Sequence, residues 1–109
     1  MVRVHATVQN GVFEEITAHG HAADRNTGAN IPCAAVSALL RTAARLLELE
    51  EGVTIDGTAA KPGDFRLQLT SINDDKLEWL RGVTDYLIIG LKTIEQDFPD
   101  EVILDLLVR

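Results

Sequence analysis

One cysteine and one nearby histidine are the residues of this chain whose types and spacing could do chemistry. Cys33 is the only thiol in 109 residues, and His21 precedes it across a polar stretch. A thiolate is a strong nucleophile, and an imidazole near neutral pH can take the thiol proton and later give it to a leaving group. The two residues therefore favour covalent catalysis by a thiol, although spacing alone does not prove their contact.

Local sequence predicts where the helix that carries Cys33 begins. Pro32 suits the first helical position, because it gives up an N–H that would have no partner there. Cys33 would then be second or third in the helix, among free backbone N–H groups and at the positive end of the helix dipole. We expect this place to favour the thiolate, and the N–H of Cys33 and a neighbouring amide to hold an oxyanion.

The spacing of apolar residues predicts the elements that must position this pair. Alternation predicts strands over residues 2–9, 12–19, 53–55, 65–69 and 102–108, and periods of three or four predict helices over 31–52 and 77–98. Asn10-Gly11 is a pair suited to a tight hairpin turn. The order ββαββαβ predicts an α+β fold of two layers, two helices on a largely antiparallel sheet of about five strands. Residues 1–109 fit one domain.

Apolar stripes are predicted on both helices, and the second helix carries more apolar surface than one sheet can cover. In the first helix the predicted stripe consists of Ile31, Ala34, Ala35, Ala38, Leu39, Thr42, Leu46 and Leu49. The main stripe of the second helix consists of Leu77, Leu80, Thr84, Leu87, Leu91, Ile94 and Phe98. Neighbouring faces of this helix carry Trp79, Val83, Tyr86 and Ile89. Gly82 and Gly90 are expected to allow close backbone approach on these faces. An exposed apolar face of this kind predicts a two-fold homodimer through the second helix.

Charge and composition limit the classes of partner and compartment. Ten Lys and Arg against 17 Asp and Glu give a formal charge of −7, which disfavours nucleic acid and anionic membranes and favours a basic protein partner. One cysteine excludes a disulfide within the chain. No apolar run approaches the roughly 20 residues that span a bilayer, and the amino terminus lacks a signal-peptide core. These features predict a cytoplasmic protein.

The residues around the thiol resemble a known family signature. Gly20-His21-Ala22 followed by Gly28-Ala29-Asn30-Ile31-Pro32-Cys33-Ala34-Ala35-Val36-Ser37 is similar to the ribosomal-processing cysteine proteases, the Prp family. That family is typically written Gly-His-Ala, a short loop, then Gly-x-Asp-Ile-Val-Cys-Ala-Ala-Val-Ser. Asn30 and Pro32 depart from it, standing where Asp and Val are usual. The likeness spans nearly the whole chain.

The resemblance implies a cytoplasmic, homodimeric endopeptidase that removes an amino-terminal extension from bacterial large-subunit ribosomal protein twenty-seven. It places the nucleophile at Cys33 and the general base at His21. No cofactor is expected, and no metal, because ligand spacing is poor and there is no second cysteine. The residues expected to contact substrate are Ser37, Ala34, Asn30 and Gly28. Ser37 follows Cys33 by one helical turn, so its hydroxyl would lie on the same face.

Other interpretations of the same residues stay open at this point. A lone cysteine in an alanine-rich helix is commonly a buried core residue. His5, His19, His21 and Cys33 could form a zinc site, although their spacing is poor. Otherwise His5 and His19 are expected to be solvated strand residues. For the whole chain, the alternative function is a non-catalytic, ribosome-associated binding module for a basic partner.

Overall fold

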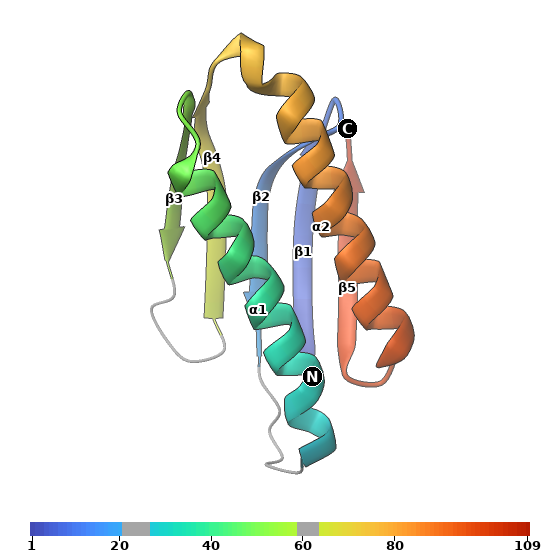
Figure 1. Ribbon diagram of the computed structural model, residues 1–109. Coiled ribbons are helices and arrows are strands. Elements are labelled where there is room, and N and C mark those ends of the chain that lie inside the picture. Colours follow the sequence, from blue (N-terminus) through green and yellow to red (C-terminus); the bar gives the residue numbers. More distant parts are fainter. Residues whose placement is uncertain (21–26, 59–63) are drawn as a thin grey trace.

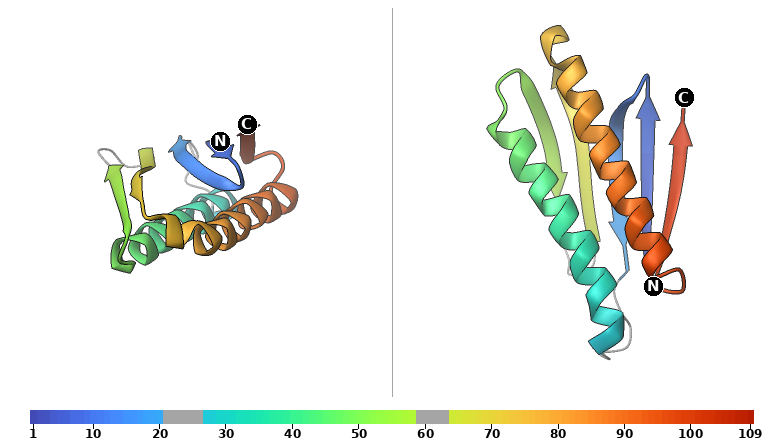
Figure 2. Two further views of the ribbon diagram at one scale, coloured as in Figure 1. Left: turned by 90° about the horizontal axis from the view of Figure 1, so that it is seen from above. Right: turned by 45° about the vertical axis from the view of Figure 1, so that its right-hand side comes forward.

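Two helices lie side by side on one face of a five-stranded sheet in the computed structural model (Figures 1 and 2). The structure describes residues 1–20, 27–58 and 64–109, with the side chains of 27–30 outside that description. The elements are β1 Val2–Gln9, β2 Val12–His19, α1 Thr27–Leu49, β3 Val53–Thr58, β4 Asp64–Ile72, a short 3₁₀ turn Asp74–Lys76, α2 Leu77–Asp97 and β5 Val102–Val108. The predicted α+β fold and its element order are confirmed.

The sheet has the strand order β3-β4-β2-β1-β5. β1 pairs antiparallel with β2 and parallel with β5, and the remaining neighbours are antiparallel. The β1–β2 hairpin closes through Asn10 and Gly11, whose φ angles of 55° and 81° match the primed turn predicted for this residue pair. β3 and β5 are therefore the edge strands, and the β1–β2 pair lies inside the sheet.

The core lies between the sheet and the two helices. Alternate residues of β1 are buried, together with residues of the other strands and one stripe of each helix. The strands contribute Val2, Val4, Ala6, Val8, Val12, Phe13, Ile16, Ala18, Val53, Leu67 and Val102, and the helices contribute Val36, Leu40, Ala43, Leu47, Leu80, Leu87 and Leu91. No helix covers the other face of the sheet (Figure 2), on which β1 places the polar residues Arg3, His5 and Thr7, as strict alternation predicts.

The stripe predicted for the first helix is the wrong face of α1. Leu46 and Leu49 of that stripe are 44% and 79% exposed, whereas Leu40 and Leu47 are almost completely buried. Alanine is common on several faces of this helix, so apolar spacing alone fixes its phase poorly. The sheet is covered by the branched residues of the neighbouring stripe instead.

Three hydrogen bonds tie α2 to the backbone of the strands beneath it. The β1–β2 register shifts between Thr7 and Val8, and the Phe13 N–H donates to Thr84 Oγ1 at 3.0 Å. Arg81 Nε donates to the Asn10 carbonyl at 3.2 Å, and the Leu104 N–H donates to Glu95 Oε2 at 2.7 Å. Each bond satisfies a backbone group at a sheet irregularity, a turn or an edge, so α2 is positioned by directional contacts as well as by burial.

Candidate active site

The end of β2 directs the chain toward the predicted base. Gly20 follows β2 with a φ angle of 90°, and a Cβ there would overlap the Met1 carbonyl oxygen. Only glycine fits this left-handed turn beside the amino terminus. The sequence motif includes Gly20, but the close approach to Met1 that requires glycine here is evident only from the structure. His21 itself lies outside the described residues.

Cys33 sits deeper in its helix than the sequence predicts. α1 begins at Thr27, so Pro32 is inside the helix and Cys33 belongs to its second turn. The prediction that Cys33 lies among free N–H groups of a first turn is wrong, because interior N–H groups bond to the preceding turn. The same finding removes the predicted oxyanion donors at this helix start. Because Pro32 has no N–H, α1 lacks one of the backbone hydrogen bonds that would join its first turn to its second turn.

The thiol is half-buried rather than enclosed. Cys33 packs against the edge of the hydrophobic core, while Ala34 beside it and Ser37 one turn further along α1 are exposed. Ser37 follows Cys33 by four residues, so both lie on one face of α1 as predicted. Gly28 and Asn30 belong to the first turn of the helix, and their contacts are outside the description. Cys33 is therefore not a fully buried core residue, because part of its surface is exposed to solvent.

His5 and His19 lie on the polar face of the sheet, opposite the helices. His5 Nδ1 is 3.3 Å from Asp105 Oδ2, and His19 Nδ1 is 3.5 Å from Asp64 Oδ1. Both side chains are about half exposed, as expected for solvated strand residues. The sheet separates them from Cys33 in the helix layer, so the structure does not bring the proposed zinc ligands His5, His19 and Cys33 together.

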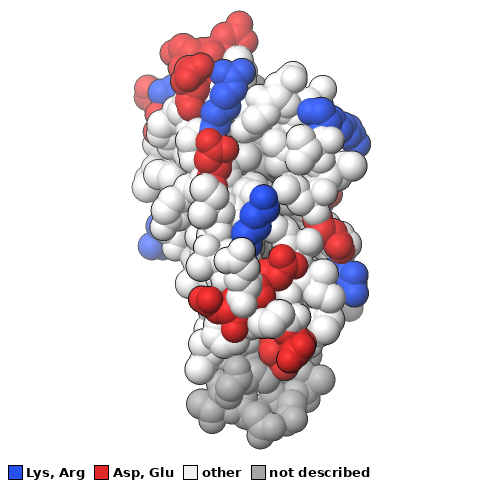
Figure 3. All heavy atoms as spheres, turned by 90° about the vertical axis from the view of Figure 1, so that its right-hand side faces the viewer, with Lys and Arg blue, Asp and Glu red and all other residues white. Residues whose placement is uncertain are grey.

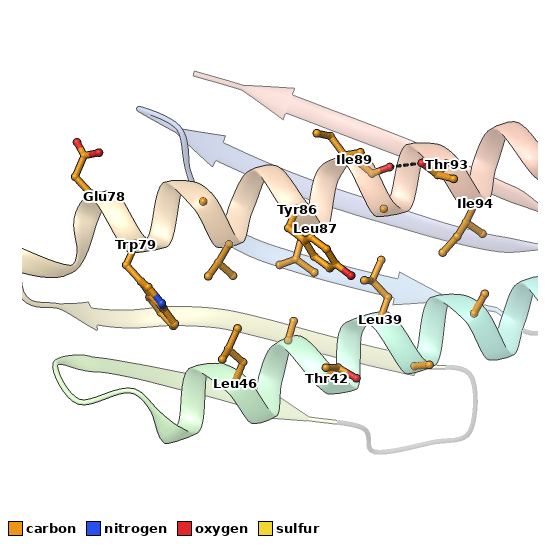
Figure 4. Close-up of a pocket in the computed structure, with 16 residues that line it drawn as sticks. Leu39, Thr42, Leu46, Glu78, Trp79, Tyr86, Leu87, Ile89, Thr93 and Ile94 are labelled. Atoms are coloured by element: carbon orange, nitrogen blue, oxygen red, sulfur yellow. Dashed lines mark hydrogen bonds between the residues drawn. The ribbon is translucent and has the colours of Figure 1, made fainter.

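A separate apolar hollow of about 1030 Å³ lies between α1 and α2 (Figure 4). Leu39, Thr42 and Leu46 line its α1 side, and Trp79, Tyr86 and Ile89 line its α2 side. Thr42 follows Cys33 by nine residues, two and a half helical turns, so the thiol and this hollow face opposite sides of α1. The hollow is therefore not a continuation of the candidate active site.

Comparison with known proteins agrees with the fold and the thiol motif. The model of the family described as cysteine protease Prp matches residues 1–103, so the chain belongs to this family of cysteine proteases. No curated protein sequence matches the chain. Family membership favours the protease over the alternative of a non-catalytic binding module.

Solved structures with the same fold cover nearly the whole chain. SMU.848 from Streptococcus mutans has a TM-score of 0.84 at 22% identity, covering 100% of this chain and 96% of its own. The essential ribosomal processing protease Prp from S. aureus, with a covalently linked product peptide, has a TM-score of 0.79 at 22% identity, covering 97% and 99%. The same protease with a substrate peptide has a TM-score of 0.81 at 20% identity and the same coverage.

Proposed function

We propose that residues 1–109 form one cytoplasmic endopeptidase domain that removes the amino-terminal extension of large-subunit ribosomal protein twenty-seven. The family match, which spans both His21 and Cys33, carries this proposal. The S. aureus relative is described as a ribosomal processing protease, which supports the substrate class. In the described part of the chain no helix is long and apolar enough to cross a membrane.

In the proposed reaction, His21 takes the proton of the Cys33 thiol, and the thiolate attacks the scissile carbonyl carbon. The tetrahedral intermediate collapses to a thioester, and the leaving amine takes its proton from His21. Water, deprotonated by His21, then hydrolyses the thioester and regenerates the thiol. Half-burial of Cys33 beside exposed Ala34 and Ser37 supports this role, because an extended peptide can lie across this face of α1. Gly28 and Asn30 are proposed to contact the same peptide from the first helical turn.

The test uses the purified precursor of the host's own ribosomal protein and follows its mass. Wild-type protein is expected to release the extension at one position, and neither Cys33→Ala nor His21→Ala should release it. Both variants should keep the wild-type circular dichroism spectrum and melting temperature. An intact precursor after incubation with folded wild-type protein would refute the proposed substrate.

The acidic surface is proposed to raise the rate at which a basic ribosomal protein is captured. Figure 3 shows carboxylates clustered over the face formed by α2 and β5, with fewer basic side chains between them. The attraction between this chain, with its net charge of −7, and a basic protein acts over a distance that becomes shorter as the salt concentration rises. We expect kcat/KM for the full precursor to fall between about 50 and 500 mM salt, while a short neutral peptide changes little. Equal salt dependence for both substrates would contradict this role.

We also propose that the chain forms a two-fold homodimer through α2. Tyr86 and Ile89 are 73% and 64% exposed beside the apolar hollow (Figure 4), and a Cβ at Gly82 would meet nothing within 4 Å. Gly90, by contrast, is used within the chain, because a Cβ there would lie 2.9 Å from Leu39. The close approach expected at Gly90 is thus made by Leu39 of α1 within the chain, and Gly82 is the glycine left for the proposed interface.

Charge supports an antiparallel pairing of the two α2 helices. Asp85 and Lys92 lie four residues before and three residues after Ile89, and neither has an ion pair among the described residues. With Ile89 at the two-fold axis, Asp85 of each protomer would face Lys92 of the other. Light scattering should show a dimer, and Ile89→Glu should make it a monomer. Leu107→Glu, a matched change on exposed β5, should leave the dimer intact; a wild-type monomer at micromolar concentration would refute the pairing.

A further inference from the structure

Two histidines lie side by side on the face of the sheet that no helix covers (Figure 2). His5 is on β1 and His19 on β2, and their ring centres are 6.2 Å apart, with ring planes inclined by 56°. In the β1–β2 register His5 is opposite Thr17 and His19 is opposite Arg3, so the two histidines are diagonal neighbours on one face. Their side chains are 48% and 57% exposed, which leaves both rings accessible to a ligand.

A carboxylate on the next strand outward lies beside Nδ1 of each ring. His5 Nδ1 is 3.3 Å from Asp105 Oδ2 on β5, and His19 Nδ1 is 3.5 Å from Asp64 Oδ1 on β4. Because the sheet runs in the order β4-β2-β1-β5, these carboxylates flank the histidine pair on its two outer sides. In an imidazole ring Nδ1 and Nε2 lie on opposite sides of the Cβ–Cγ axis. A ring with Nδ1 on its outer side therefore has Nε2 on its inner side, toward the other histidine.

We infer that His5 and His19 bind one divalent transition-metal ion that prefers imidazole ligands, such as Zn²⁺, through their Nε2 atoms. A carboxylate beside Nδ1 favours the proton on that nitrogen, which leaves the Nε2 lone pair free for a metal and makes it more basic. Zn–N bonds of about 2.0–2.1 Å allow two imidazole rings on one ion to have centres about 5–6.5 Å apart, and the observed separation lies in this range. Asp64 and Asp105 also offset the charge of the ion, although Arg3 Nη1 lies 3.4 Å from Asp105 Oδ2.

The two histidines supply only part of the coordination of the ion. Among the residues that the structure describes, no group of three or more His, Cys, Asp or Glu side chains is arranged to hold a metal ion, so water completes the coordination. Cys33 lies in the helix layer, on the other side of the sheet, and takes no part. The inferred site therefore joins β1 to β2 on the open face and is separate from the candidate active site.

The test titrates Zn²⁺ into the Cys33→Ala protein, made without a histidine tag, so that the thiol cannot take the ion. Calorimetry should give one ion per chain, and His5→Gln and His19→Gln in this background should each lower the affinity by more than about tenfold. Asp64→Asn keeps both ligands and should lower the affinity by about tenfold, because it weakens the contact that orients His19. Since the ion binds only the folded chain, Zn²⁺ should raise the melting temperature of the parent but of neither histidine variant.

The matched control is His21→Gln, which removes the third histidine and should keep the affinity of the parent. All variants should give the parent's circular dichroism spectrum without metal, because the substituted side chains of β1 and β2 are exposed. The inference is overturned if the folded parent binds no Zn²⁺, or if His5→Gln and His19→Gln bind it as tightly as the parent. None of these measurements depends on cleavage, so their outcome leaves the proposed function as it stands.

Discussion

The two helices cover the same face of one sheet but are held to it in different ways. α2 is joined to strand backbone by hydrogen bonds through Arg81, Thr84 and Glu95. Among the described side chains of α1, none forms such a bond, and this helix is held by apolar contacts alone. Apolar contact is not directional, so α1 can adjust its position at lower cost than α2. The helix that carries Cys33, the proposed nucleophile, is thus the one whose position is less constrained by hydrogen bonds.

The largest expected effect separates activity from stability on α1. Cys33→Ala should lower kcat/KM by about 10³-fold or more, because no other described side chain can replace the thiolate as nucleophile. Its melting temperature should stay close to that of the wild-type protein, since Cys33 is only half-buried. Peptide cleavage and thermal unfolding of the same preparation measure both quantities. Retained cleavage would mean that the chemistry lies elsewhere in the chain.

A buried leucine should contribute equally to the free energy of unfolding on the two helices. Leu40 of α1 and Leu87 of α2 are each 1% exposed, and replacing either with alanine should lower the free energy of unfolding by about 2–5 kcal/mol. Urea unfolding followed by circular dichroism gives both values. If Leu40→Ala lowers the free energy of unfolding far less than Leu87→Ala, then α1 moves more readily to fill the cavity left by the substitution. That result would show that α1 is held less rigidly than α2.

The directional contacts should matter on α2 only. Thr84→Val removes the acceptor of the buried Phe13 N–H at nearly constant volume and should lower the free energy of unfolding by about 1–3 kcal/mol. Thr84→Ser keeps the hydroxyl and should cost less. Thr42→Val, a matched change at an exposed position of α1, should stay within about 0.5 kcal/mol of wild type. Equal losses in Thr84→Val and Thr42→Val would remove the proposed difference between the helices.

The smallest expected effect concerns the ion pair that joins the chain after α1 to the turn before α2. Lys76 Nζ lies 2.7 Å from Glu50 Oε1, and this hydrogen bond raises the pKa of the Lys76 ammonium above its ordinary value of 10.5. A raised pKa in the folded state stabilises the protein fully below pH 10.5, and this contribution is lost as the pH rises through the folded-state pKa. The melting temperatures of wild type and Lys76→Met should therefore converge above that pH. A constant difference across the range would show that packing, not charge, is involved.

Much of this protein was determined by local sequence. Strict alternation in β1 and the Asn10-Gly11 pair predict the first hairpin correctly, because side-chain period and turn preference act between near neighbours. The helix around Cys33 and the face shared by Cys33 and Ser37 follow in the same way from a spacing of four. The motif around His21 and Cys33 identifies the family, since it depends only on residue types and their order.

Other features were decided by tertiary structure, because they depend on which surfaces meet. Sequence spacing predicts Leu46 and Leu49 as part of the covered stripe, yet the sheet selects the stripe of Leu40 and Leu47 on the same alanine-rich helix. Pro32 suits a helix start by its own geometry, yet α1 extends to Thr27 and places Cys33 in the second turn. Thr84 is an ordinary threonine in sequence, and it becomes a buried acceptor only because a strand irregularity frees the Phe13 N–H directly beneath α2. Periodicity fixes which residues share a face, whereas contact between distant elements fixes which face is buried and which polar groups find partners.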